Sequence, residues 1–159
     1  MSGLTTCLWF DKRAEEAARF YGRVFGDAFQ LGRIAHAPID YPAGRAGDVL
    51  TVEFTLFGQA FLALNGGPYT SFTDAVSLQV GTEDQAETDR LWEALTADGG
   101  APVACGWLKD KFGLRWQITP RRLTELLADP DPGVAARVMA AMMDMVKIDI
   151  ATLDAAAAG

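Results

Sequence analysis

The strongest constraint on the fold is a strand-and-helix pattern that occurs twice. Residues 4–10 and 75–81 both have the composition of a short strand, and each is followed by apolar residues at helical spacing. Aligning the two helical stretches places Tyr21 on Trp92, an offset of 71 residues. The sequence therefore indicates an internal duplication.

Each predicted helix is preceded by a capping residue and followed by strands. Asp11 and Thr82 occupy equivalent positions in the two copies and are predicted N-caps, since their side-chain oxygens suit the first helical amides. Both copies thus read strand-helix-strand-strand-strand, which predicts an α+β protein of two βαβββ modules. The predicted later strands are 28–36, 48–57 and 60–65 in the first copy, and 102–107 and 114–119 in the second.

The length of 159 residues suits one domain with a substantial core. We expect a single domain over 1–159, with module 1 at about 4–67, module 2 at about 73–119, and a helical extension over 120–159. Thr119 and Asp131 each precede a proline and Asp149 precedes an apolar run, so all three are predicted caps of the C-terminal helices. The methionine-rich helix there either covers a sheet face or contacts a second subunit.

The charge balance excludes several classes of partner. The chain has 14 basic and 21 acidic residues, for a net charge of −7, which disfavours nucleic-acid binding. No apolar run approaches the roughly 20 residues that cross a bilayer, and the first residues lack the features of a leader. With only Cys7 and Cys105 there is no disulfide framework. We expect a cytoplasmic protein that binds neither nucleic acid nor membrane.

Three segments of the chain resemble a known family. They are CLWFDKRAEEAARFY (7–21), ALNGGP (63–68) and GWLKDKFGLRWQI (106–118). Together they resemble the PhnB-like branch of the glyoxalase/bleomycin-resistance/dioxygenase, or vicinal oxygen chelate, superfamily, a group often labelled 3-demethylubiquinone-9 3-methyltransferase-like. The resemblance implies two βαβββ modules whose sheets form a cupped pocket, commonly completed in a homodimer.

The resemblance also implies where a metal ion would bind. Metalloenzymes of the superfamily take ligands from the first and last strand of each module, and the matching positions are Thr6, Ala63, Ala75 or Ser77, and Gln117. Of these only Gln117 is a usable ligand, whereas a divalent cation needs three or more good ones. The sequence therefore predicts no metal and no cofactor.

The methyltransferase label finds little support in the residues. A nucleotide-type methyltransferase needs a glycine-rich turn after its first strand that opens onto a helix. Here the first strand is followed by residues 11–14, which contain no glycine, and Gly66-Gly67 precedes a turn. Methyl transfer is the least favoured interpretation.

Strand alternation predicts the lining of the pocket. One face should carry an apolar wall with neutral polar groups and one guanidinium, as ligand pockets often do. The predicted lining is Thr6, Leu8, Phe10, Phe61, Asn65, Ser77, Gln79, Trp107, Arg115 and Gln117. No catalytic residue is assigned.

Two functions remain open. The first is a glyoxalase-fold protein with a degenerate metal site that binds or acts on a small amphiphilic or aromatic ligand. The second is a dimeric interaction or regulatory module without a ligand.

Several single residues have alternative interpretations. Arg115 either pairs with an acidic side chain such as Glu53 or awaits an anionic group of a ligand. Asp110 lies either at the pocket mouth or in a solvated turn. Cys7 should face the helix layer, and His36 should be a loop histidine beside the Pro- and Gly-rich segment 36–48.

Overall fold

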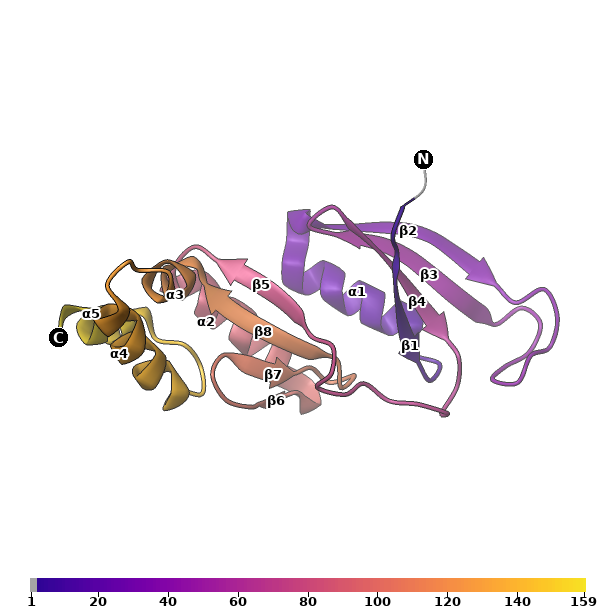
Figure 1. Ribbon diagram of the computed structural model, residues 1–159. Helices are drawn as coiled ribbons and strands as arrows, with labels where there is room; N and C mark the ends of the chain where they lie inside the picture. The colour runs from indigo at the N-terminus through magenta and orange to yellow at the C-terminus, as the bar shows by residue number, and fades with distance from the viewer. Residues whose placement is uncertain (1–2) are drawn as a thin grey trace. The chain divides into compact units, whose positions relative to one another are not determined.

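The computed structural model describes residues 3–159 and divides into two compact units. The first unit ends at Phe72, and the second is Thr73–Gly159. Each unit contains a four-stranded mixed sheet with a helix packed on it, and the second also carries the C-terminal helices (Figure 1). The predicted α+β class, with two βαβββ modules followed by helices, is confirmed.

The first unit has its parallel strand pair at one edge of the sheet. The strand order is β1-β4-β3-β2, in which β1 runs parallel to β4 and the other neighbours are antiparallel. Its elements are β1 (Thr6–Phe10), α1 (Ala14–Phe25), a 3-10 turn η1 (Gly26–Ala28), β2 (Phe29–His36), β3 (Val49–Leu56) and β4 (Gln59–Asn65).

The core of the first unit lies between α1 and one face of this sheet. Tyr21 of α1 contacts Phe54 of β3, with ring centroids 6.1 Å apart, and Phe54 stacks on Phe61 of β4 at 5.1 Å. All three rings are buried. The helix α1 packs on this aromatic face because its apolar residues recur at helical spacing and so lie on one side of the helix.

The second unit repeats the same order with shorter strands. The sheet order is β5-β8-β7-β6, and β5 and β8, the first and last strands along the chain, again run parallel. Its elements are β5 (Leu78–Thr82), α2 (Gln85–Thr96), η2 (Ala97–Gly99), β6 (Ala101–Pro102), β7 (Trp107–Lys109) and β8 (Arg115–Pro120), followed by α3 (Arg121–Leu127), α4 (Pro132–Met143) and α5 (Ile150–Ala158).

The two copies differ by one residue between the first strand and the helix. The helices Ala14–Phe25 and Gln85–Thr96 obey the offset of 71, but three residues separate β1 from α1 and only two separate β5 from α2. The buried positions Leu8 and Phe10 of β1 therefore correspond to Val80 and Thr82 of β5, not to Gln79 and Gly81. In the longer loop Lys12 has a positive φ of 59°.

Both predicted caps at the start of the repeated helices are wrong. The Ala14 amide that opens α1 donates to Asn65 Oδ1 of β4 at 2.9 Å, so a distant side chain caps this helix. At α2, Asp84 caps the helix by accepting from the Glu87 amide at 2.8 Å. Thr82 is instead buried, with its hydroxyl 2.6 Å from that of Thr88.

Of the three caps predicted for the C-terminal helices, Asp131 and Asp149 are confirmed and Thr119 is wrong, since α3 begins after Pro120 without a side-chain cap. Asp131 Oδ1 accepts from the Gly133 amide at 2.8 Å, and Asp149 Oδ1 accepts from the Thr152 amide at 2.7 Å. Hydrogen bonds from the Thr152 side chain and from this amide hold the pKa of the Asp149 carboxyl below its usual value. The helices α3, α4 and α5 then enclose an apolar cluster of their own: Leu123, Leu126, Val138, Ile148 and Leu153.

None of the helices within residues 3–159 is both long and apolar enough to cross a membrane.

Candidate ligand pocket

The first unit turns most of its predicted pocket residues into the core. Leu8, Phe10, Phe61 and Asn65 are each at most 5% exposed, on the face of the sheet that α1 covers. Thr6 is half-buried on the same face, and its hydroxyl accepts from Gln59 at 3.1 Å. The predicted face is therefore wrong for this unit. The physical reason is the extra residue before α1, because a shift of one along a strand exchanges its two faces.

The opposite face of that sheet carries the residues expected to be inside. Cys7, predicted to face the helix, is exposed, and partial desolvation raises the pKa of its thiol. Trp9 is half-buried there, and its indole donates to the Gly67 carbonyl at 2.8 Å. A Cβ on Gly66 would lie 2.2 Å from the Trp9 ring. Gly66 thus makes room for a tryptophan.

In the second unit, the predicted polar residues lie on the sheet face that α2 does not cover. Gln79 of β5 and Trp107 of β7 are the register partners of Gln117 on β8, so these three side chains are neighbours across the strands. Gln117 Nε2 donates to the Ser77 hydroxyl at 2.8 Å. The alternating buried residues of β8, such as Trp116, point the other way.

Arg115 forms an ion pair inside its own unit. Its guanidinium pairs with Asp74 and also donates to the Gly113 carbonyl at 2.7 Å. Glu53, the acidic partner suggested by the sequence, pairs instead with Arg33 at 2.8 Å. An acidic partner for Arg115 was thus correctly expected, but the residue named was wrong.

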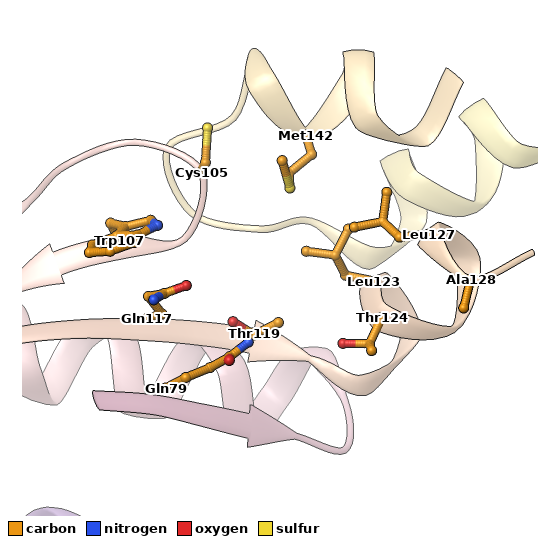
Figure 2. A pocket seen from close by; sticks show the side chains of 10 residues that line it. All are labelled: Gln79, Cys105, Trp107, Gln117, Thr119, Leu123, Thr124, Leu127, Ala128 and Met142. Atoms are coloured by element: carbon orange, nitrogen blue, oxygen red, sulfur yellow. The ribbon is translucent and has the colours of Figure 1, made fainter. Parts of the chain in front are cut away.

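A cavity of about 400 Å³ opens over the polar face of the second sheet (Figure 2). Its lining combines three of the predicted residues with others from the loop before β7, the end of β8 and the C-terminal helices. The lining residues are Gln79, Cys105, Trp107, Gln117, Thr119, Leu123, Thr124, Leu127, Ala128 and Met142. Figure 2 shows Met142 directed from α4 toward the strands, across the cavity from Gln117.

The cavity is divided by polarity, and no charged side chain lines it. The amides and a hydroxyl of Gln79, Gln117 and Thr119 come from the strands, while Leu127 and Met142 come from the helices. None of the helical lining residues was among the predicted pocket residues, although a methionine-rich helix over a sheet face was one predicted alternative and the apolar residues at 123 and 127 were a usable signal.

Asp110 does not lie at a pocket mouth or in a solvated turn. It is 1% exposed and accepts from the Phe112 amide at 2.8 Å, the Leu114 amide at 3.1 Å and the Trp116 indole at 2.9 Å. Both sequence interpretations of this residue were wrong. Asp110 organises the turn between β7 and β8, and with it the start of the strand that carries Gln117.

The side chains around Gln117 are a poor set of ligands for a divalent ion. Its neighbours Ser77 and Gln79 offer a hydroxyl and a neutral amide, whereas such ions require several carboxylate, imidazole or thiolate groups. Within residues 3–159, no three His, Cys, Asp or Glu side chains are grouped closely enough to hold a metal. The residues present do not fit the metal of the wider superfamily.

Comparison with known proteins gives one family and several similar structures. The family model described as 3-demethylubiquinone-9 3-methyltransferase matches residues 2–119. The PhnB protein from Bacillus cereus is 34% identical over 75% of this chain and 99% of its own, with a TM-score of 0.66. No match was found among the curated proteins.

Two more distant structures share the fold. Protein PA1353 from Pseudomonas aeruginosa is 20% identical, with a TM-score of 0.61 over 76% of this chain and 98% of that one. The fosfomycin resistance protein FosX from Listeria monocytogenes is 13% identical, with a TM-score of 0.52 over 76% of this chain and 93% of that one. The chain therefore belongs to the 3-demethylubiquinone-9 3-methyltransferase-like, or PhnB-like, family and shares its fold with PA1353 and FosX.

Proposed function

We propose that this protein binds a small, neutral, amphiphilic molecule in the cavity of its second unit, without a metal ion. The observation that carries the proposal is the lining of that cavity: the strands supply amides and a hydroxyl, the helices supply mostly apolar side chains besides Thr124, and none of the described lining residues is charged. Ligand pockets combine a mostly apolar wall with a few convergent polar groups in this way.

The electrostatics favour a ligand without charge. A buried anion or cation needs an opposite charge or several hydrogen bonds to replace its lost hydration. Arg115, the cation nearest along β8, is already neutralised by Asp74, and no carboxylate lines the cavity to hold a cation. A neutral molecule avoids this desolvation penalty.

The hydrogen-bonding pattern favours a planar head with both a donor and an acceptor. Gln117 Nε2 is engaged by Ser77, which leaves the Gln117 carbonyl oxygen facing the cavity side as an acceptor. Gln79, its partner across the strands, supplies a second amide, and Trp107 supplies an aromatic surface beside it. A flat polar group such as an amide or a phenol can hydrogen-bond to both glutamines and lie against the Trp107 ring.

Methyl transfer, the activity in the family's name, is less well supported. The glycines that would suggest a nucleotide-binding turn are Gly66 and Gly67, whose amides both donate to the Phe10 carbonyl, at 3.0 and 3.3 Å. No helix begins after them, since the next element along the chain is β5. Their contacts explain them as packing residues of the first unit.

The test uses benzamide as a neutral planar probe. Replacing Gln117 with alanine should weaken benzamide binding, measured by calorimetry, about fivefold or more, because one direct hydrogen bond is lost. The melting temperature should hardly change, since Gln117 is only half-buried. Added EDTA should leave binding by the wild type unchanged.

Gln30→Ala is the matched control, because Gln30 is an exposed strand glutamine outside this cavity. Binding that is equal in Gln117→Ala and wild type, or that requires a divalent ion, would contradict the proposal.

A second candidate role is that of a homodimeric interaction module, which an open sheet edge in the first unit favours. Strand β2 is an edge strand paired only with β3, and its Leu31 is 43% exposed. Open edges of this kind are commonly covered in soluble proteins. The half-buried Leu62 and Leu64 add apolar surface on the face opposite α1.

We expect light scattering at micromolar concentration to give twice the chain mass of 17.1 kDa. Leu31→Lys should shift the protein toward the monomer. Ile39→Lys should not, because Ile39 is as apolar and 71% exposed but lies in the loop after β2. A monomer mass for the wild type would exclude this role.

A further inference from the structure

The helical segment 121–158, which we call the C-terminal cap, lies beyond the part of the chain that the family model matches. The match ends at residue 119, yet half of the cavity lining comes from the cap. Those residues are Leu123, Thr124, Leu127, Ala128 and Met142. This half of the pocket is therefore a feature of this chain that the family match does not describe.

One glutamine fastens the cap to the rest of the second unit. The Gln85 side chain, in the first turn of α2, donates to the Ile148 carbonyl at 3.1 Å and accepts from the Ile150 amide at 2.8 Å. Gln85 also donates to Asp89 at 2.9 Å, and Asp89 pairs with Lys147. The hydrogen bonds from Lys147 and Gln85 lower the pKa of the Asp89 carboxyl.

Backbone contacts hold the same segment on the other side of the cavity. The Cys105 amide donates to the Met145 carbonyl at 2.8 Å, and the Gly106 amide donates to the Val146 carbonyl at 2.9 Å. Ile148 is fully buried, and a Cβ on Gly106 would lie 3.0 Å from it. The cap is thus fixed on a close-fitting surface, and its cavity-lining residues have defined positions.

Apart from the Thr124 hydroxyl, the side chains that the cap contributes to the cavity are apolar. Leu127 and Met142 offer flexible apolar surface opposite the amides of Gln79 and Gln117. Methionine side chains adapt readily to unbranched apolar groups. The two walls together match a molecule with a polar head and an apolar substituent.

We propose that the C-terminal cap sets ligand specificity by holding an alkyl substituent of the ligand against Met142 and Leu127, while its polar head lies on Gln79 and Gln117. This inference rests on the proposed function and adds the chemical class of the ligand: a neutral planar head that carries a short alkyl chain.

The experiment measures the affinities of benzamide, 4-ethylbenzamide and 4-butylbenzamide. In the wild type each added methylene should tighten binding about fourfold, as expected for full burial of a CH₂ group. In Met142→Gln the gain per methylene should fall below about twofold, since a polar group replaces the apolar contact.

Met143→Gln is the matched control, because Met143 is the neighbouring methionine, is 65% exposed and does not line the cavity. It should keep the wild-type gain per methylene. Leu127→Gln is a second test variant whose fold is safer, since Leu127 is already 36% exposed. Circular dichroism verifies that each variant is folded.

The results separate the two proposals. The role of the cap is overturned if affinity does not rise with alkyl length in the wild type. It is also overturned if the gain per methylene is the same in Met142→Gln and Leu127→Gln as in the wild type. Neither outcome contradicts the binding of benzamide itself. Failure of every benzamide to bind the wild type overturns the proposed function and this inference together.

Discussion

Replacing Asp110 with alanine should lower the free energy of unfolding by about 4 kcal/mol, because it leaves buried donors without an acceptor. The carboxylate accepts from two backbone amides and from the Trp116 indole, all within 3.1 Å. The site is 1% exposed, so water does not replace these bonds without rearrangement. Urea unfolding followed by tryptophan fluorescence measures the effect.

Two further variants make this expectation specific. Asp110→Asn keeps one acceptor oxygen but brings an NH₂ group toward the same donors, so its loss should be smaller than that of alanine. Lys109→Ala, at an exposed neighbouring position, should change stability by less than about 0.5 kcal/mol. A stability for Asp110→Ala within about 1 kcal/mol of wild type would show that the three hydrogen bonds contribute little.

Asn65→Ala should lower the free energy of unfolding by about 3 kcal/mol, the cost of losing a helix cap and of leaving a part-buried carbonyl without its donor. Asn65 Oδ1 accepts from the Ala14 amide and Nδ2 donates to the Val49 carbonyl, both at 2.9 Å. The residue thus joins β4, α1 and β3. Thermal unfolding followed by circular dichroism measures the change.

Asn65→Asp separates the two hydrogen bonds. A carboxylate still accepts from the Ala14 amide and suits the helix N-terminus, but it repels the Val49 carbonyl. Its stability should therefore fall between those of the wild type and the alanine variant. If Asn65→Asp is as unstable as Asn65→Ala, the helix cap contributes little.

The sequence predicted element order and helix positions well because these depend on local spacing. Apolar residues at helical intervals located α1 and α2 at the predicted offset, and the resemblance in three segments led to the right family. The face of the sheet to which each strand residue points was harder to predict, because side chains alternate between the two faces and a shift of one residue exchanges them. The loop around Lys12 introduced that shift between the copies.

Residues of the candidate pocket were predicted only where the alternation of side chains within a single strand was enough to identify them. Alternation along β8 correctly separated Gln117 from Trp116. The opposite wall depends on Gln85 holding a backbone more than 60 residues later, as its 63-residue separation from Ile148 shows. A helix that covers a sheet face was one of the two alternatives for the methionine-rich segment, but no local pattern encodes which residues meet, so the position of Met142 opposite Gln117 was not predictable. The same holds for Asp110, whose burial depends on a tryptophan in the following strand.

The fastening of the C-terminal cap by Gln85 has a consequence for the order of events during synthesis. Chains fold broadly from the N-terminus as they leave the ribosome. The strand residues Gln79 and Gln117 emerge before Met142, and the backbone at Ile148 and Ile150 that Gln85 holds emerges later still. A nascent chain that has formed its second sheet therefore exposes the polar wall alone. If the proposed pocket binds an alkyl-bearing ligand, tight binding should begin only after the residues that Gln85 holds have left the ribosome, because the apolar wall is not in place before then.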